Sequence, residues 1–218
     1  FFKYGLEGPL IGKYFSGLIL NKASVILAFA TFLIENEYIT SSSRLVDIAC
    51  GNGRDSFFFQ KNGIHAVGID ASSSAIQNNK RVALESGMSA DSFMVVDIND
   101  QEKLSQYQDF DNFYARFFIH SISEQEQVKF MNFLKTVKPQ AKLLLEFRTD
   151  KDPMFKKSLA VGVQEGVTDH YRRYINFETF IKNLSTYGFK VAYQHEDQGL
   201  SVHGDDNPFL GRVVAIKG

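Results

Sequence analysis

Three acidic residues and a glycine-bearing turn stand where they could bind a polar ligand together. Asp47 precedes a turn that contains Gly51 and Gly53, and Asp70 and Asp97 end the next two short apolar runs. Glycines let a ligand approach the backbone, and the start of a following helix offers unpaired N–H donors. Asp70 stands about where a carboxylate binds ribose hydroxyls in dinucleotide-binding folds. The pattern predicts a nucleotide-like ligand, the alternative being a tight turn whose glycines serve packing alone.

A second group of polar residues interrupts later apolar runs. Arg116 lies inside the run 112–121, and a buried arginine needs an anionic partner because an unpaired buried charge is costly. Either Glu146 or a group of the ligand could be that partner. His120 is either a hydrogen-bonded core histidine or a group that positions or deprotonates a substrate.

A basic and aromatic cluster follows a later strand. Arginine binds two oxygens of a phosphate or carboxylate at once, and tyrosine and histidine add hydrogen-bond donors. The cluster therefore predicts an anionic substrate, the alternative being a solvated basic start to the next helix. Candidate substrate-binding residues are Glu146, Arg148, Tyr171, Arg172 and Arg173, and His170 is a second candidate base after His120.

Short apolar runs alternate with helical patterns from residue 44 onward, which predicts an α/β fold with a mainly parallel sheet covered on both faces. We expect strands at 44–48, 65–70, 92–96, 112–117, 142–147, 190–195 and 210–217. We expect helices at 55–62, 73–85, 123–136 and 177–187, the last ending at Gly188. No helical pattern separates the final two strands, so we expect an antiparallel hairpin at the sheet edge.

Two segments depart from this alternation. Residues 1–40 combine a glycine-bearing loop with a densely apolar helical stretch, which predicts an N-terminal helical cap on a main domain of residues 41–218. Residues 149–175 are far longer than the usual strand-to-helix loop of about 2–6 residues. We expect this insertion, together with the cap, to cover the site at which a substrate would bind. The chain begins with Phe1, so the domain is interpretable as one part of a longer protein.

Composition limits the partners and the location. The 218 residues carry 24 Lys and Arg against 25 Asp and Glu, a net charge of -1, which gives no general attraction for nucleic acid or anionic lipid. The apolar stretch 25–34 is too short for a membrane span. A single cysteine, Cys50, excludes an internal disulfide and a cysteine-based zinc site. We therefore expect a cytoplasmic protein without a metal site of that kind.

From Arg44 to Lys217 the sequence resembles the class I S-adenosylmethionine (SAM)-dependent methyltransferases. The resemblance implies a Rossmann-like, seven-stranded, mainly parallel sheet with an antiparallel last strand. It also implies that Gly51 and Gly53 line the methionine part of SAM and that Asp47 holds its ammonium group. Asp70 would bind the ribose hydroxyls and Asp97 the adenine amino group. Further cofactor contacts are expected from Ala49, Asn52, Ala71, Ile98 and Arg116.

Some residues depart from this family or from its competitors. The family usually has glycine where this chain has Ala49. A nicotinamide-dependent oxidoreductase is a poorer match, because its G-x-G-x-x-G motif needs glycine at the position of Ser56. A DNA or RNA adenine methylase would carry Asn/Asp-Pro-Pro-aromatic where this chain has 117–120, Phe-Phe-Ile-His.

The resemblance implies methyl transfer, with oxygen of a small or glycan-linked molecule as the expected acceptor. Short strings around Arg116 and Arg172 are similar to methyltransferases found with surface-polysaccharide genes. A hydroxyl acceptor would benefit from a base, for which His120 is the first candidate, whereas a phosphate or carboxylate is already ionised. A non-catalytic SAM-binding domain of a larger protein is the alternative.

Overall fold

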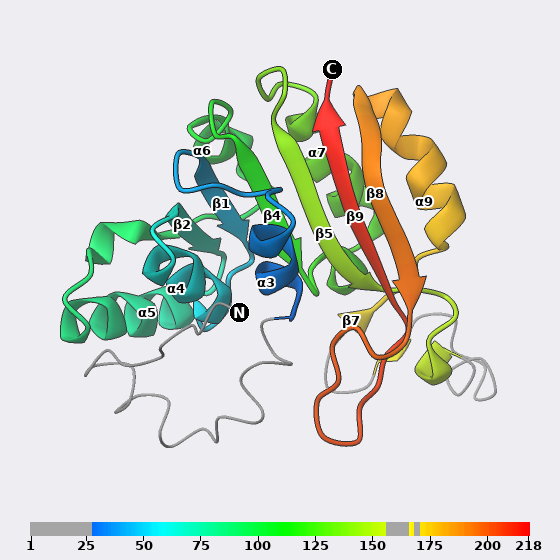
Figure 1. The fold of residues 1–218 in the computed structure, drawn as a ribbon, viewed down its shortest axis with the longest axis horizontal. Helices are drawn as coiled ribbons and strands as arrows, with labels where there is room; N and C mark the ends of the chain where they lie inside the picture. The colour runs from blue at the N-terminus through cyan, green and yellow to red at the C-terminus, as the bar shows by residue number, and fades with distance from the viewer. Residues whose placement is uncertain (1–27, 156–165, 168–170) are drawn as a thin grey trace, which may run out of the picture.

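The computed structural model describes residues 28–155, 166–167 and 171–218. At its centre lies a seven-stranded sheet in the order β3-β2-β1-β4-β5-β9-β8 (Figure 1). In chain order the strands are β1 (Arg44–Ile48), β2 (His65–Asp70), β3 (Phe93–Val95), β4 (Asn112–Arg116), β5 (Lys142–Arg148), β8 (Phe189–Asp197) and β9 (Leu210–Lys217). A separate antiparallel pair joins β6 (Gly166–Val167) to β7 (Tyr171–Arg172). The predicted α/β class and the seven strands are confirmed.

Strands β1 to β5 pair with one another only in parallel, so their carboxyl ends meet at one edge of the sheet. The last strand, β9, runs antiparallel to both β5 and β8. The hairpin of β8 and β9 is therefore as predicted, but β9 lies inside the sheet and β8 forms its edge. Strand β9 pairs with β5 over the whole length from Lys142 to Arg148, and its other side pairs with β8.

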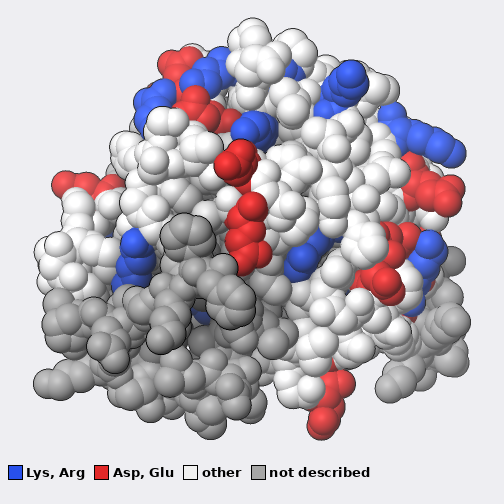
Figure 2. All heavy atoms as spheres, viewed as in Figure 1, with Lys and Arg blue, Asp and Glu red and all other residues white. Residues whose placement is uncertain are grey.

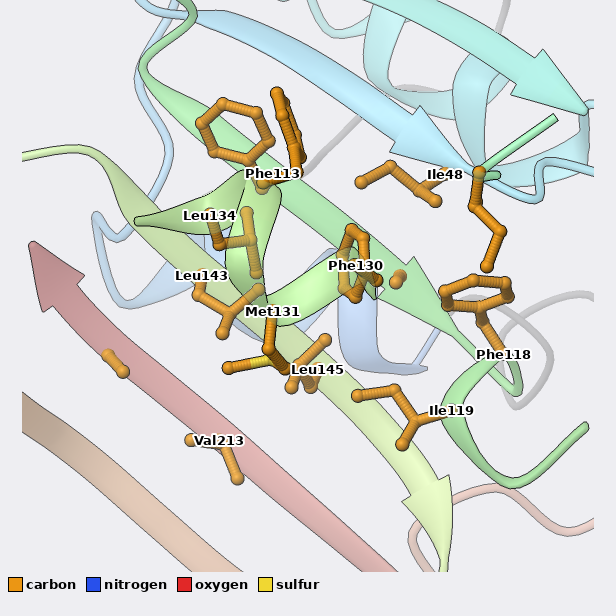
Figure 3. Close-up of a cluster of buried hydrophobic side chains, with 14 of the residues drawn as sticks. Ile48, Phe113, Phe118, Ile119, Phe130, Met131, Leu134, Leu143, Leu145 and Val213 are labelled. Atoms are coloured by element: carbon orange, nitrogen blue, oxygen red, sulfur yellow. The ribbon is translucent and has the colours of Figure 1, made fainter. Parts of the chain in front are cut away.

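Helices cover both faces of the sheet, because successive strand residues point to opposite sides. One face carries α3 (Ala28–Glu35), α4 (Arg54–Lys61) and α5 (Ser73–Glu85), and the other carries α6 (Gln101–Ser105), α7 (Glu124–Leu134) and α9 (Phe177–Leu184). The larger cluster of buried side chains lies on the α7 side, where Phe130 and Met131 gather against Leu143 and Leu145 of β5 (Figure 3).

Local sequence signals explain several helix ends. The side chains of Ser123 and Glu126 form a reciprocal capping box at the start of α7. Helix α9 continues as a 3₁₀ turn, Ser185–Tyr187, and stops at Gly188, whose φ of 81° is in the left-handed region. The predicted stop is therefore confirmed, whereas the short helix α6 was not predicted.

The described part of the predicted cap is α3 and the turn after it. Phe29, Ala30 and Leu33 are buried in the smaller cluster, where Phe29 stacks on Tyr114 of β4 with ring centroids 5.6 Å apart. Helix α3 thus packs on a face of the sheet. Residues 1–27 and most of the insertion lie outside the described residues, so their covering of an acceptor site stays a prediction.

The surface that the structure describes carries mixed charge. Figure 2 shows acidic and basic side chains interspersed over the described part of one face. Among the described residues, no helix has both the length and the apolar character needed to cross a bilayer.

Candidate functional site

The loop between β1 and α4 has a backbone that favours glycine at three positions. Ala49, Gly51 and Gly53 have φ angles of 56°, 52° and 71°, all in the left-handed region. A Cβ on Gly51 would meet no described atom within 4 Å, whereas one on Gly53 would lie 3.0 Å from atoms of Asn79 and Phe57. Gly51 therefore borders space that a ligand could enter, whereas a side chain at Gly53 would be crowded by Asn79 and Phe57. The angle of Ala49 explains why glycine is usual there in the family that the sequence resembles.

Asn79 of α5 holds this loop in place, although no motif marked it. Its side chain is fully buried, and Nδ2 donates a hydrogen bond to the Gly51 carbonyl at 2.8 Å. Because Asn79 stands in the middle of a helix, its role becomes visible only when α5 packs beside the loop. The predicted cofactor neighbour Asn52 is exposed, and its Oδ1 accepts from the Arg54 N–H at 3.4 Å.

Asp70, at the end of β2, contacts the glycine loop directly. Its carboxylate accepts hydrogen bonds from the N–H groups of Gly51, at 2.9 Å, and Ser72, at 2.8 Å. A carboxylate oxygen can accept more than one bond, so Asp70 retains capacity for ligand hydroxyls. Asp97 lies beyond the end of the neighbouring strand β3, is exposed, and accepts from the Asn99 N–H at 2.8 Å. The structure thus brings Gly51 and Asp70 together and places Asp97 at the adjacent strand end.

The other predicted residues of this edge differ in exposure. Ala71 is exposed and Ile98 is buried. Asp47 is also buried, and its Oδ2 accepts a hydrogen bond from the Ser56 hydroxyl at 2.6 Å. Burial and the nearby charge of Asp55 raise the pKa of Asp47 to about 8, so this carboxyl holds a proton at neutral pH in the absence of a cationic ligand.

A buried chain of alternating charges runs behind the glycine loop from α4 to β9. Asp55, in the first turn of α4, lies 3.4 Å from an Arg116 nitrogen and accepts a hydrogen bond from the Tyr114 hydroxyl at 2.7 Å. Arg116 Nε donates to one oxygen of Glu146 at 2.8 Å, and Arg212 Nε donates to the other at 2.6 Å. Each buried charge therefore has an opposite partner, which limits the cost of removing it from water.

Of the two partners left open for Arg116, Glu146 contacts it in this structure. The Glu146 side chain is fully buried and both of its oxygens are bound by arginines of the same chain. These pairs favour a structural role for Glu146, and the substrate contact that we expected stays a prediction. A contact between Arg116 and the cofactor stays a prediction.

His120 lies in a 3₁₀ turn just beyond β4 and is almost completely buried. Burial and the guanidinium groups of Arg148 and Arg172 lower the pKa of His120 to about 3. The ring nitrogen Nδ1 accepts the backbone N–H of Arg148 at 3.2 Å, so the proton of the neutral ring is on Nε2. The expected role of His120 as a base is therefore unfavourable, and a role as a hydrogen-bond donor fits the ring better.

Arg148, at the end of β5, is bonded within the chain. Its guanidinium donates to Asp152 at 2.9 Å and also to Asp206. Its positive charge is therefore balanced by two carboxylates, which leaves less of it for a substrate anion.

The two neighbouring arginines of the insertion differ. Arg173 donates to the Ile122 carbonyl at 2.8 Å and to the Gln127 side chain, and it lines a cavity of about 240 Å³ between α7 and α9. Arg172 is half-buried, and among the described residues its one hydrogen-bond contact is the Met154 sulfur at 3.7 Å. Counting only partners in the described residues, Arg172 is the one of the three predicted arginines whose side chain has neither an oxygen acceptor nor a carboxylate partner. His170 and the side chain of Tyr171 lie outside the described residues.

Comparisons with known proteins bear on the fold and the family of the chain. The family described as "Methyltransferase domain" matches residues 39–160. A SAM-dependent methyltransferase from Anabaena variabilis is 18% identical, with a TM-score of 0.70 over 96% of this chain and 94% of that chain. Magnesium protoporphyrin IX methyltransferase from Synechocystis, solved with bound S-adenosylhomocysteine (SAH), is 14% identical, with a TM-score of 0.66 over 90% and 83%.

The same fold also occurs in a [4+2]-cyclase, SpnF, which is 16% identical with a TM-score of 0.65 over 86% of this chain and 80% of that chain. No curated protein sequence matches this chain. The structural likenesses show the fold, and the family match, which spans more than half of the sequence, shows the relationship. On that match the chain belongs to the methyltransferase domain family.

Proposed function

We propose that this protein uses SAM to methylate an oxygen of a small or glycan-linked acceptor that carries a negative charge. The observation that carries the proposal is the edge formed by Gly51 and Asp70, where a loop N–H meets a carboxylate beside open space. The side chain missing from Gly51 leaves room for the methionine part of SAM. Asp70 and Asp97 would then bind the ribose hydroxyls and the adenine amino group.

Within this site the protein acts mainly by orientation. SAM, when bound, supplies an activated methyl group on its sulfonium, and the chain has to hold an acceptor oxygen in line with it. Such alignment can supply roughly 7–11 kcal/mol of barrier reduction in well-oriented systems. His120, with its proton on Nε2, would donate a hydrogen bond that fixes the acceptor.

The negative charge of the acceptor is supported by two residues. The Arg172 guanidinium has no carboxylate partner among the described residues and lies close enough to His120 to lower its pKa. A histidine whose pKa is about 3 is a weak base, so an acceptor that is already ionised suits this site better than a hydroxyl. Both observations favour a phosphate or carboxylate, and the link to surface polysaccharides stays part of the proposal.

Another reaction, or cofactor binding without catalysis, is the second candidate. Its support is SpnF, which has this fold but is named as a [4+2]-cyclase and not as a methyltransferase. A cytoplasmic location, inferred from the single cysteine, also stays a prediction.

The acceptor experiment uses SAM with an isotopically labelled methyl group. We would incubate the protein with cell-envelope and small-metabolite extracts and search by mass spectrometry for a labelled methyl gain. A methylated phosphate- or carboxylate-bearing small molecule or glycan is expected. Methylated nucleic acid or protein as the sole product would contradict the acceptor class, and no labelled product with any extract would favour the second candidate.

A further inference from the structure

The loop that joins β8 to β9, residues 198–209, is attached to the strand ends of the site. In Figure 1 it projects from the edge of the sheet at which β4 and β5 end, near β7. Its residues 203–207 are exposed, whereas Ser201 and Pro208 on either side are buried. No motif marked this β8–β9 loop, yet three arginines from three strands hold it.

The first attachment is at Ser201. Its hydroxyl accepts a hydrogen bond from Arg116 Nη2 at 2.8 Å and donates one to Glu146 at 3.0 Å. The carbonyl of the preceding residue, Leu200, accepts from Arg212 at 2.7 Å. This end of the loop is therefore fixed by the buried chain of charges.

The second attachment is at the other end of the loop. Arg148 binds Asp206, and the Phe209 N–H donates to Asp152, the residue that Arg148 also binds, at 3.2 Å. Both ends of the β8–β9 loop are thus bonded to charged groups at the carboxyl ends of the central strands.

Arg116 reaches the cofactor side with the same guanidinium. Its Nη1 lies 3.4 Å from Asp55, a longer contact than the 2.8 Å between its Nε and Glu146. The other oxygen of Asp55 is buried and has no hydrogen bond among the described residues, and the nearest cation given for it is Arg54, whose Nε lies 3.7 Å away. Asp55 comes two residues after Gly53 and directly before Ser56, whose hydroxyl donates to Asp47 at 2.6 Å, and its charge helps to raise the pKa of Asp47. Asp47 is the residue expected to meet the ammonium group of SAM.

We propose that Arg116 is a positioning residue that couples occupancy of the cofactor site to the order of the β8–β9 loop. The inference rests on the proposed function, because it needs a cation to arrive beside Asp47 and Asp55. That cation adds positive charge next to Asp55, which weakens the hold of Asp55 on Arg116. The Arg116–Asp55 contact, which is the longer one, then breaks first. The Arg116 guanidinium moves away from Asp55, and its hydrogen bonds to Glu146 and Ser201 become stronger. Such coupling is reciprocal, so an ordered loop would also favour cofactor binding.

Hydrogen exchange of the full chain, with and without SAH, tests this coupling. SAH should slow amide exchange several-fold both in the glycine loop and in residues 198–209. The related ligand 5′-methylthioadenosine lacks the ammonium and carboxylate groups, so it should slow exchange near Asp70 but leave the β8–β9 loop unchanged. Equal protection of the loop by both ligands would overturn the route through Asp55.

Variants in the β8–β9 loop separate loss of this coupling from a general loss of stability. Ser201→Ala should keep SAH-induced protection of the glycine loop and lose it in the β8–β9 loop, and Ser201→Thr, which keeps the hydroxyl, should restore it. His203→Ala, in the exposed part of the same loop, is the matched control and should respond as the wild type does. Unchanged loop protection in Ser201→Ala would overturn the proposal.

Failure of the proposed function has a different signature. If calorimetry detects no SAH binding to the wild type, both the proposed function and the coupling are wrong. If SAH binds and protects only the glycine loop, the proposed function stands and the coupling is wrong.

Discussion

The carboxyl ends of β1–β3 and of β4–β5 lie along one edge of the same sheet but hold their polar groups in different ways. At the first, the Gly51 N–H and the Asp70 carboxylate meet beside open space. At the second, Arg116 and Arg148 are already bonded to carboxylates of the chain. A site made by backbone shape can therefore be read from a motif, whereas a charged side chain reveals its partner only in the fold.

The carboxyl ends of β4 and β5 form the expected acceptor half of this edge, and there loss of charge at Glu146 should have the largest effect on stability. Glu146→Gln leaves Arg116 and Arg212 without their shared carboxylate in a buried setting, which should lower the free energy of unfolding by about 3–5 kcal/mol. Chemical denaturation would measure it. The control is Glu85→Gln, whose pair with Arg81 at 2.6 Å is exposed and should be worth less than about 1 kcal/mol. Similar losses in both variants would remove the structural role of Glu146.

The carboxyl ends of β1–β3 form the expected cofactor half of the edge, and there Asp70→Ala should have the largest effect on ligand binding. Hydrogen bonds to a charged group contribute about 1.5–3 kcal/mol each, so loss of the two expected ribose contacts should weaken SAH by more than about 100-fold. Calorimetry measures the affinity. Asp97→Ala removes one expected contact at an exposed position and should weaken SAH less. If Asp97→Ala weakened SAH more than Asp70→Ala, the main contact with the cofactor would lie beyond β3 and not at the end of β2.

The buried His120 should make stability depend on pH. The unfolded chain binds a proton at His120 near its ordinary pKa of 6.5, whereas the folded protein binds it only near pH 3, so a falling pH favours the unfolded state. Between pH 7 and 5 this group alone should lower the free energy of unfolding by about 2 kcal/mol.

Asp47, whose pKa is raised to about 8, changes stability in the opposite sense over the same interval, so the comparison needs a variant. Denaturation of the wild type and of His120→Asn at the two pH values isolates the histidine. The wild type should lose about 2 kcal/mol more than the variant. An identical pH dependence would show that His120 is accessible to protons in the folded protein.

The two arginines of the insertion sharpen the contrast inside the acceptor half. Arg172→Ala should raise the acceptor's Michaelis constant about tenfold and leave SAH affinity nearly unchanged, as expected for loss of a substrate contact. Arg173→Ala, which removes bonds to Ile122 and Gln127, should lower thermal stability and leave the Michaelis constant near the wild-type value. Steady-state kinetics on the acceptor found by methyl labelling measures both, and the reverse pattern would exchange the two roles.

Much of the fold could be predicted because its signals are local. The bounds of β1, β2, β9 and α5 were predicted as the structure has them, since apolar strand runs and helix caps lie within a few residues of each end. The position of β9 between β5 and β8 could not, because strand order depends on pairing between distant segments.

The site divides in the same way. The left-handed turn at Gly51 and Gly53 could be predicted because it depends on neighbouring residues. The roles of Asn79, Ser201 and Arg212 could not, because each contacts a group far away in the chain. The expected base role of His120 is disfavoured for a physical reason that the sequence does not contain. Its burial and the Arg148 N–H on its Nδ1 both come from tertiary packing.

Calorimetric titration of the wild-type protein with SAM, SAH, NAD and NADP tests the cofactor assignment most directly. We expect SAM and SAH to bind with one site per chain and NAD and NADP to give no binding heat. Binding of NAD or NADP without binding of SAH would contradict the assignment, because the loop at Gly51 and the carboxylate at Asp70 would then serve a different nucleotide.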